Sequence, residues 1–169
     1  MAGAHPAPRR VTIVTGGAQG IGGAISRRLA RAGDLVVLND VDAHAAEETC
    51  EQITRAGGAC VPVAGDAAER AVAERVAATA LQEGGGRVDV LVNNVGDFRP
   101  ASKTFLHSTP EQWQRLYEVN LLHVLTMTHA VLPHMVERGS GCVVNNATVE
   151  AFRGIPGHAP YSAYHAGVG

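Results

Sequence analysis

The sequence predicts an α/β protein built on a doubly wound parallel sheet, and three observations lead to this fold class. Short apolar segments alternate along the chain with helical segments of about 10–15 residues. The first apolar segment runs directly into a glycine-rich turn that opens a helix, and the second ends in an acidic residue. Strands and helices that alternate in this way need parallel strands joined by right-handed crossovers.

The first half of the chain contains three expected strands and two expected helices. The strand segments are short and apolar, as is usual for strands that are buried on both faces of a sheet. An alanine-rich helical segment ends at Gly57-Gly58, because glycine commonly follows the last turn of a helix. The strands are expected at 11–15, 35–38 and 60–63, and the helices at 21–32 and about 43–56.

The second half continues the alternation and contains one well-marked helix start. Thr109, Pro110 and Gln112 have the pattern of an N-cap, a first-turn proline and a capping-box partner. The helix that follows is expected to be interrupted near Glu118, and Pro133 to bend it or mark its last turns. The expected elements are helices near 67–81, from 110 and from about 161, and strands at 88–92 and 141–145.

Composition and charge argue against several classes of protein. The net charge of −2, without a basic stripe or an acidic tail, gives no support for nucleic-acid binding. No apolar stretch is long enough to span a bilayer, and the first ten residues lack the apolar run of a signal peptide. We therefore expect a cytoplasmic protein without membrane contact. Residues 1–9 are expected to be a disordered tail, and residues 10–169 to form one domain.

The cysteines and histidines indicate no metal site. Cys50, Cys60 and Cys142 lie far apart and form no paired metal or redox spacing. We expect them to be small packing residues in a reducing cytosol. The eight histidines likewise show no ligand spacing, so no structural metal is expected.

The glycine turn after the first strand has the residues that a dinucleotide site needs. Gly16 can take the tight turn, and Gly20 lets the backbone approach a ligand without a β-carbon in the way. Gly22 permits close packing of helix on strand, so that amides at the helix start face a pyrophosphate. An ordinary strand–turn–helix connection is the alternative for this segment taken alone.

An acidic residue at the end of the second strand strengthens the dinucleotide hypothesis. Asp40 stands eighteen residues past Gly22, where a carboxylate can accept hydrogen bonds from the hydroxyls of an adenosine ribose. The same charge would repel a 2′-phosphate, and neither Val41 nor Gln19 supplies a base to bind one. The spacing therefore favours NAD over NADP.

These motifs together resemble the classical short-chain dehydrogenase/reductase family, and the likeness extends from about Arg10 to the last residue. The segment from Thr15 to Gly22 matches the family's cofactor turn, and Asp40 matches its NAD-type acidic residue. Asp66 stands where the family contacts the adenine ring. Residues 93–96, Asn-Asn-Val-Gly, resemble the family's Asn-Asn-Ala-Gly element.

The resemblance implies a Rossmann fold with an NAD site and a helix asparagine, Asn120, that supports a proton-relay water. The implied cofactor-binding residues are Gly16, Gln19, Gly20, Ile21, Gly22, Asp40, Asp66, Ala67, Asn93, Val95, Gly96, Tyr161 and His165. The implied catalytic residues are Asn120, Thr148, Tyr161 and His165.

The catalytic end departs from the family pattern. The family has a serine thirteen residues before its catalytic tyrosine and a lysine four residues after it, which here correspond to Thr148 and His165. Thr148 keeps a hydroxyl that can polarise a substrate carbonyl, although its methyl group stiffens the side chain. Tyr161 fits as the general acid in reduction and the general base in oxidation.

His165 is the larger departure, because the family's lysine holds the nicotinamide ribose and lowers the pKa of the tyrosine. A unit charge about 4 Å from a phenolate is worth roughly 4 kcal/mol at an effective dielectric constant of about 20. Histidine is mostly neutral above pH 7, so most of this effect is expected to be lost. In the alternative hypothesis, His165 points away from the site.

The chain ends soon after the family's catalytic helix begins, and the resemblance implies that the C-terminal strands are missing. Full-length relatives are expected to be homo-oligomers, and the uncovered sheet edge of the isolated chain is expected to promote association. The implied function is an NAD-dependent oxidoreductase that transfers a hydride between a secondary alcohol or ketone and the nicotinamide. The alternative is a truncated, catalytically impaired nucleotide-binding paralogue.

The sequence does not identify the small-molecule substrate. The loop 97–108 is long for such a fold, which more often marks a functional loop than a structural one. Its residues Phe98, Arg99, Lys103 and Phe105 would suit an acidic or ring-bearing compound. Surface charge on a mobile loop is the favoured explanation of the same residues.

Overall fold

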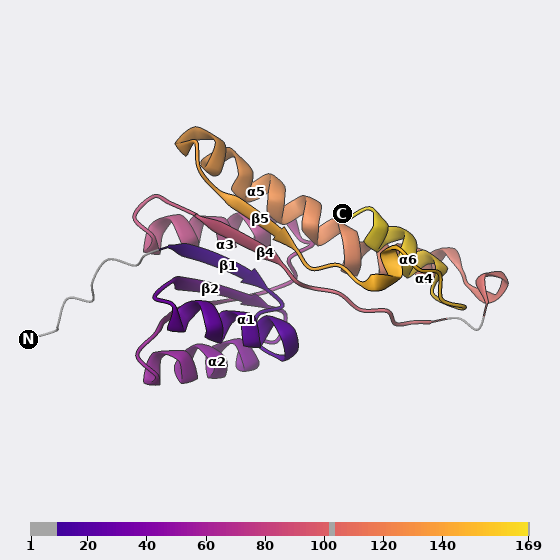
Figure 1. The fold of residues 1–169 in the computed structure, drawn as a ribbon, viewed down its shortest axis with the longest axis horizontal. Helices are drawn as coiled ribbons and strands as arrows, with labels where there is room; N and C mark the ends of the chain where they lie inside the picture. The colour runs from indigo at the N-terminus through magenta and orange to yellow at the C-terminus, as the bar shows by residue number, and fades with distance from the viewer. Residues whose placement is uncertain (1–9, 102–103, 169) are drawn as a thin grey trace, which may run out of the picture.

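The five strands of the protein form one parallel sheet with helices on both faces (Figure 1). The structure is a computed structural model that describes residues 10–101 and 104–168. The predicted fold class is confirmed, whereas the expected tail at 1–9 and Lys103 lie outside the described residues. The strands are β1 (Val11–Thr15), β2 (Leu35–Asp40), β3 (Ala59–Ala64), β4 (Val90–Asn93) and β5 (Cys142–Asn145). The α-helices are α1 (Gly20–Arg31), α2 (Ala43–Arg55), α3 (Arg70–Glu83), α4 (Pro110–Tyr117), α5 (His123–Arg138) and α6 (Ala159–Ala166).

The strand order places a crevice at the middle of the sheet. The order is β3-β2-β1-β4-β5, so the chain builds outward from β1 and then returns to its other side. At such a reversal the loops after β1 and β4 turn to opposite faces, which opens a crevice beyond their carboxyl ends. The glycine turn after β1 and the long loop after β4 both begin there.

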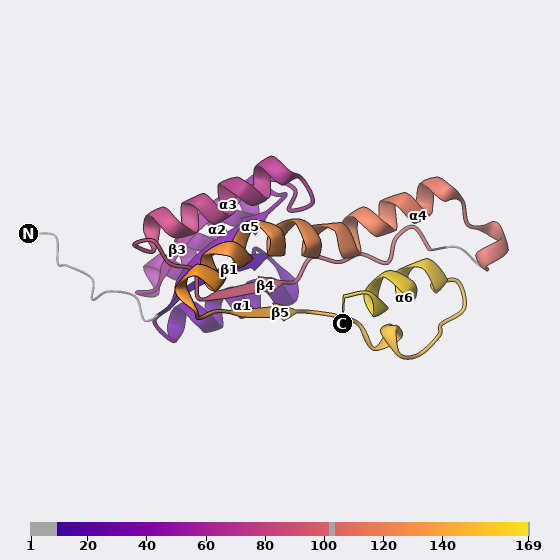
Figure 2. The same ribbon diagram turned by 90° about the horizontal axis from the view of Figure 1, so that it is seen from above.

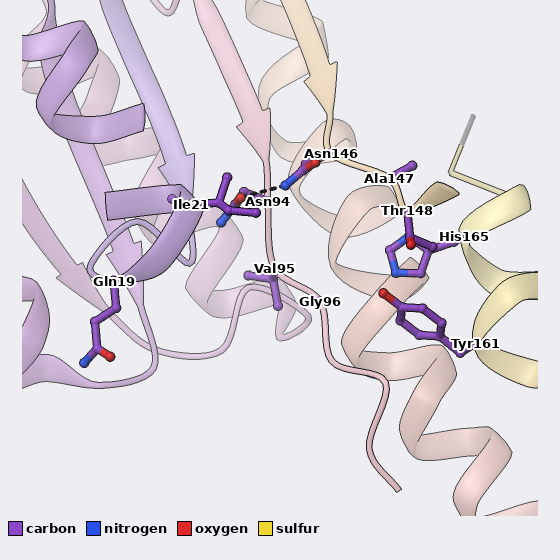
Figure 3. Close-up of a pocket in the computed structure, with 11 residues that line it drawn as sticks. Gln19, Ile21, Asn94, Val95, Gly96, Asn146, Ala147, Thr148, Tyr161 and His165 are labelled. Atoms are coloured by element: carbon purple, nitrogen blue, oxygen red, sulfur yellow. Dashed lines mark hydrogen bonds between the residues drawn. The ribbon is translucent and has the colours of Figure 1, made fainter. Parts of the chain in front are cut away.

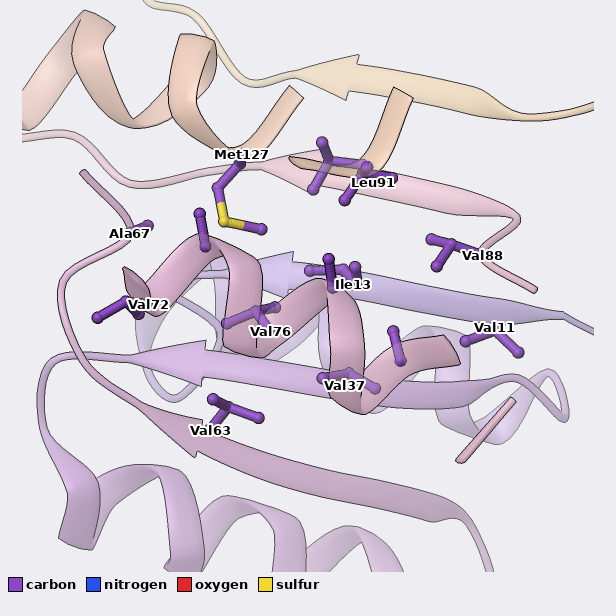
Figure 4. Packing of buried hydrophobic residues seen from close by; sticks show 14 of the residues in the cluster. Val11, Ile13, Val37, Val63, Ala67, Val72, Val76, Val88, Leu91 and Met127 are labelled. Carbon is purple, nitrogen blue, oxygen red and sulfur yellow. The ribbon is translucent and has the colours of Figure 1, made fainter. Parts of the chain in front are cut away.

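Two hydrophobic cores hold the helices against the sheet. On one face, β1, β2 and β4 pack against α3 and α5, as Figure 4 shows for Ile13, Leu91 and Met127. On the other face, side chains such as Val14 and Leu38 pack against α1 and α2. All five residues of β1 are buried, because this central strand is covered on both faces.

The long helical segment 110–138 starts and breaks where the sequence predicted. The side chain of Thr109 accepts from the amide of Gln112, and the Gln112 side chain completes the capping box. The break near Glu118 is a π-helical turn, Glu118–Leu122, between α4 and α5. Pro133 lies inside α5. In Figure 2, α4 projects beyond the sheet alongside α6.

Two expected helix starts differ from the structure. α3 begins at Arg70 rather than near residue 67, because the carboxylate of Asp66 accepts from the amide of Ala68 and forms a turn first. The last helix begins at Ala159 rather than near Tyr161, with Pro160 in its first turn.

The expectation that the three cysteines are small packing residues in a reducing environment is wrong. Cys50 of α2 and Cys60 of β3 form a disulfide, whereas Cys142 is exposed and unpaired. The turn between the two elements reverses the chain at Gly57, whose φ of 85° favours glycine. This reversal brings cysteines ten residues apart onto facing elements.

Reduction of the Cys50–Cys60 bond is expected to lower the free energy of unfolding by about 2–3 kcal/mol, because the bond closes a short loop in the unfolded chain. Denaturant unfolding with and without dithiothreitol measures this difference. The variant Cys142→Ser, which removes the exposed thiol, is the control and should respond to reductant as the parent does. Titration of three free thiols in the non-reduced protein would contradict the pairing.

β5 is bonded to β4 on one side, and within the described residues no strand pairs with its other side. Val144 of β5 is 46% exposed. The association of isolated chains through this edge stays a prediction. No helix in the described part of the chain is long and apolar enough to cross a membrane. No group of three metal-ligating side chains is found there either.

Candidate active site

Two adjoining hollows lie at the carboxyl ends of the strands and share the segment Asn94 to Gly96. The larger cavity measures about 400 Å³ and reaches from the glycine turn to α6. The smaller, of about 210 Å³, lies beyond β2 and β3. The larger cavity is lined by Gln19, Ile21, Gly22, Asn94, Val95, Gly96, Asn146, Ala147, Thr148, Tyr161 and His165 (Figure 3). The smaller is lined by Gly16, Asn39, Asp40, Val41, Gly65, Asp66, Ala67, Asn94, Val95 and Gly96.

The glycine turn at the start of α1 fits a phosphate-bearing ligand. Gly16 and Gly20 have φ values of 57° and 53°, and a β-carbon built on Gly22 would overlap the carbonyl oxygen of Gly16. A β-carbon on Gly20 would meet no atom within 4 Å, so the backbone there borders open space. No side chain caps α1, and its first turn holds no acidic residue. The amides at this helix start therefore remain available to an anion.

The smaller hollow contains two carboxylates and no basic side chain among its lining residues. Asp40 ends β2, and its two oxygens accept from the amides of Ala18 at 3.1 Å and Asp42 at 3.2 Å. These two bonds fix the carboxylate at the rim of the hollow. Because each carboxylate oxygen accepts more than one hydrogen bond, the group can still receive a ligand hydroxyl.

Asparagine side chains tie β1, β4 and β5 together beneath the cavity. Asn94 donates from Nδ2 to the carbonyl oxygens of Thr15 and Gly16, each at 3.2 Å. Asn146 donates to Oδ1 of Asn94 at 2.9 Å, the bond drawn in Figure 3. Sequence reasoning did not assign Asn94, Asn146 or the neighbouring Ala147 to the site. The signal for Asn146 was available, because it follows β5 directly beside the end of β4.

Three residues proposed from the sequence do not line either hollow. Gly20 lies at the outer side of the turn. Asn93 is buried and donates to Oδ1 of Asn145 at 3.0 Å, so it joins β4 to β5. Asn120 is completely buried in the π-helical turn. Asn93 and Asn120 thus support the site from inside the fold, whereas Gly20 borders open space.

Tyr161, Thr148 and His165 come together at one end of the larger cavity (Figure 3). The rings of Tyr161 and His165 meet edge to face, with their centroids 4.4 Å apart. Burial raises the pKa of Tyr161, and the nearby charges of Glu150 and Asp97 raise it further, while a hydrogen bond from Thr148 acts in the opposite direction. Among the described residues no cation is found to compensate these effects, so the tyrosine hydroxyl keeps its proton at neutral pH.

His165 points into the cavity rather than away from it, but it presents no free nitrogen there. Its Nε2 lies 3.2 Å from Oδ1 of Asn120. The Asn120 amide is oriented by its other bonds, because Nδ2 donates to the carbonyls of Asp97 and Leu116. Oδ1 must therefore accept, and Nε2 carries the hydrogen. Nδ1 is buried without a partner in the described residues, and burial lowers the pKa of the ring.

A second imidazole, His123, is buried close to this site. Its side chain is 1% exposed, and neither ring nitrogen has a hydrogen-bond partner within the described part of the chain. Burial, together with the nearby His165 ring when that ring is protonated, lowers the pKa of His123 to about 4. The ring is therefore neutral at physiological pH.

His158, to which sequence reasoning assigned no role, lies beside Tyr161 with their ring centroids 6.1 Å apart. Its Nδ1 lies 2.9 Å from a carboxylate oxygen of Glu150, and its ring stacks on Phe98. No spacing motif could have revealed this pair, because it depends on how the segment 146–158 folds back over the site.

The fold and the glycine turn define a Rossmann-type protein with a cavity at the crevice of its sheet. The family model described as short chain dehydrogenase matches residues 10–169, and the chain belongs to that family.

Relatives and a solved structure agree with this assignment. The chain is 38% identical over 154 residues to an uncharacterized oxidoreductase of Methylorubrum extorquens, covering 90% of this chain and 60% of that one. It is 36% identical to the 2-(R)-hydroxypropyl-CoM dehydrogenase of Xanthobacter autotrophicus, covering 90% and 62%. A 7 alpha-hydroxysteroid dehydrogenase complexed with NADH and 7-oxo glycochenodeoxycholic acid superposes with a TM-score of 0.88 at 28% identity, covering 96% and 62%. The chain thus spans about 60% of the length of these proteins.

Proposed function

We propose that the protein is an NAD-dependent oxidoreductase that transfers a hydride between a secondary alcohol or ketone and the nicotinamide. The observation that carries this proposal is the continuity of the two hollows, which share Asn94, Val95 and Gly96. A dinucleotide in this groove would extend from Asp40 past the glycine turn to Tyr161. The solved relative that holds NADH supports the same class of cofactor.

Different residues along the groove would bind the ribose, the phosphates and the substrate oxygen. Asp40 would accept hydrogen bonds from ribose hydroxyls, and the amides at the start of α1 would bind phosphate oxygens. Bound NAD supplies the hydride acceptor. Thr148 would orient the substrate oxygen by a hydrogen bond, and Tyr161 would exchange a proton with that oxygen. The proposal includes a small-molecule substrate, a cytoplasmic location and a homo-oligomeric state.

NADH formation from NAD⁺ with a panel of linear and cyclic secondary alcohols tests the proposed reaction. NAD⁺ binding without turnover at any pH would overturn it and leave the nucleotide-binding alternative. Calorimetric titration measures binding in the same samples, so that a failed reaction is distinguished from a failed site.

NAD⁺ is expected to bind more tightly than NADP⁺, because a 2′-phosphate would face the carboxylate of Asp40 in a hollow whose lining has no basic side chain. The variant Asp40→Ala should narrow the difference in affinity between the two cofactors by about tenfold, since it removes this repulsion. Calorimetry with both cofactors checks the result. The control is Asp42→Ala, which removes the carboxylate that caps α2. Equal or tighter binding of NADP⁺ by the parent would contradict the assignment.

A further inference from the structure

We propose that Glu150 and His158 form a positioning pair beside Tyr161, in which the His158 ring contacts the tyrosine ring and holds the Glu150 carboxylate in place next to it. The functional meaning of this pair rests on Tyr161 being the proton-exchanging residue of the proposed function. The contacts themselves are independent of any ligand.

The geometry of the pair fixes which group donates. Nδ1 of His158 lies 2.9 Å from Oε2 of Glu150, and the two side chains are only 22% and 15% exposed. A carboxylate can only accept, so Nδ1 carries the hydrogen whether the ring is neutral or protonated. Stacking of the imidazole on Phe98, with centroids 5.5 Å apart, holds the ring from its other side. The carboxylate is thus held in place by a partly buried donor.

The pair reaches Tyr161 directly through His158 and indirectly through Thr148. The His158 ring meets the Tyr161 ring edge to face, with an angle of 80° between their planes. The amide of Glu150 donates to Oγ1 of Thr148 at 3.3 Å, which ties the carboxylate-bearing residue to the side chain that lowers the pKa of Tyr161. The charge of Glu150 is one of the causes that raise the pKa of Tyr161.

Of the two carboxylates whose charges act on Tyr161, Glu150 is the one without a permanent counter-charge in the described part of the chain. Asp97 is paired with Arg99 through two bonds of 2.9 Å, and a guanidinium stays charged at every relevant pH. His165 lies on the remaining side, and burial keeps it neutral. An imidazole carries no charge at the alkaline pH where tyrosines ionise. Glu150 therefore opposes formation of the tyrosinate, while Asp97 is largely compensated.

The ionisation of Tyr161 in the protein without cofactor provides the test. Ultraviolet absorbance follows tyrosinate formation with pH, and subtraction of the Tyr161→Phe titration isolates this residue from the other two tyrosines. Glu150→Gln keeps the size and an acceptor oxygen but removes the charge. His158→Phe keeps the stacked ring but removes the donor, whereas His158→Asn keeps a donor near the Nδ1 position. Glu48→Gln, an exposed carboxylate on α2, is the control.

Glu150→Gln is expected to lower the ionisation midpoint of Tyr161 by on the order of one pH unit. His158→Phe should shift it in the same direction by less, because the released carboxylate turns toward solvent, and His158→Asn should stay close to the parent. In the Glu150→Gln background, His158→Phe should add no shift. An unchanged midpoint in Glu150→Gln would overturn the proposal, as would a His158→Phe shift that persists in that background.

A second readout covers the case in which a variant unfolds at alkaline pH. The pH profile of alcohol oxidation should move toward lower pH in Glu150→Gln by the same amount as the midpoint. A profile that stays at the parent's position would overturn the proposal. Absence of oxidation in every variant would contradict the proposed function instead, and the absorbance titration would still decide the role of the pair.

Discussion

Replacing His165 with lysine is expected to raise kcat/KM for alcohol oxidation by on the order of a hundredfold near neutral pH. In the parent, His165 offers Tyr161 no positive charge, because burial lowers the pKa of the imidazole. It also offers a ligand no free nitrogen, since Nε2 is bonded to Asn120 and Nδ1 is buried. A lysine at this position would supply both a charge beside the phenol and a donor in the cavity.

The size of this effect follows from electrostatics. A unit charge about 4 Å from a phenolate is worth roughly 4 kcal/mol at an effective dielectric constant of about 20, or about three pKa units. Burying the ammonium group offsets part of that gain. We therefore expect the ionisation midpoint of Tyr161 to fall by about two pH units, together with the increase in rate.

Initial rates across pH and the tyrosinate titration measure the two effects of His165→Lys separately. His165→Met has a similar reach without a charge and is the matched control, which should leave the midpoint within about half a pH unit of the parent. If the lysine variant and the parent had the same rate and the same pH profile, His165 would not occupy the position that tunes the tyrosine.

Acidification from pH 7 to pH 4 is expected to reduce the free energy of unfolding by about 3 kcal/mol through His123 alone. The pKa of His123 in the folded protein is about 4, against 6.5 for an ordinary histidine. As the pH falls below about 6.5, the unfolded chain takes up this proton first, which favours unfolding. The contribution of His123 to stability is therefore complete above pH 6.5 and is lost progressively until the folded protein is itself protonated near pH 4.

The variant His123→Leu should remove most of this pH dependence. Both ring nitrogens of His123 lack partners in the described residues, so an apolar side chain of similar volume should cost little stability at pH 7. Denaturant unfolding at both pH values measures the difference. His129→Leu, an exposed histidine on the same helix, is the control. If the free energy of unfolding of His123→Leu fell on acidification as much as that of the parent, His123 would not be the buried group responsible.

Local patterns in the sequence were sufficient for most of the fold. The glycine turn, the capping box at Thr109 and the break at Glu118 each depend on residues within one or two helical turns, and each is present in the structure. The alternation of strands and helices gave the parallel sheet, because a crossover connection allows few other arrangements. The predicted start of α3 near residue 67 was wrong, because a turn formed by the Asp66 side chain precedes the helix.

The contacts that sequence reasoning missed join residues whose proximity depends on tertiary packing. The Cys50–Cys60 bond follows from the way that β3 turns back along α2. The bond between His165 and Asn120 joins positions 45 residues apart, and it decides which ring nitrogen carries the hydrogen. Sequence spacing could place His165 near the tyrosine. Only the packing of α6 against the π-helical turn buries the ring, which lowers its pKa and leaves neither nitrogen accessible to a ligand.

Deuterium transfer tests most directly whether this site carries out hydride transfer with Tyr161 as the proton-exchanging group. The protein is incubated with NAD⁺ and secondary alcohols that carry deuterium on the carbinol carbon, and mass spectrometry follows deuterium into the nicotinamide ring of NADH. We predict transfer that increases from neutral to alkaline pH, because oxidation needs the tyrosinate and the pKa of Tyr161 is raised, and none above background in Tyr161→Phe. Equal transfer by Tyr161→Phe, or no transfer by a parent protein that binds NAD⁺, would contradict the account.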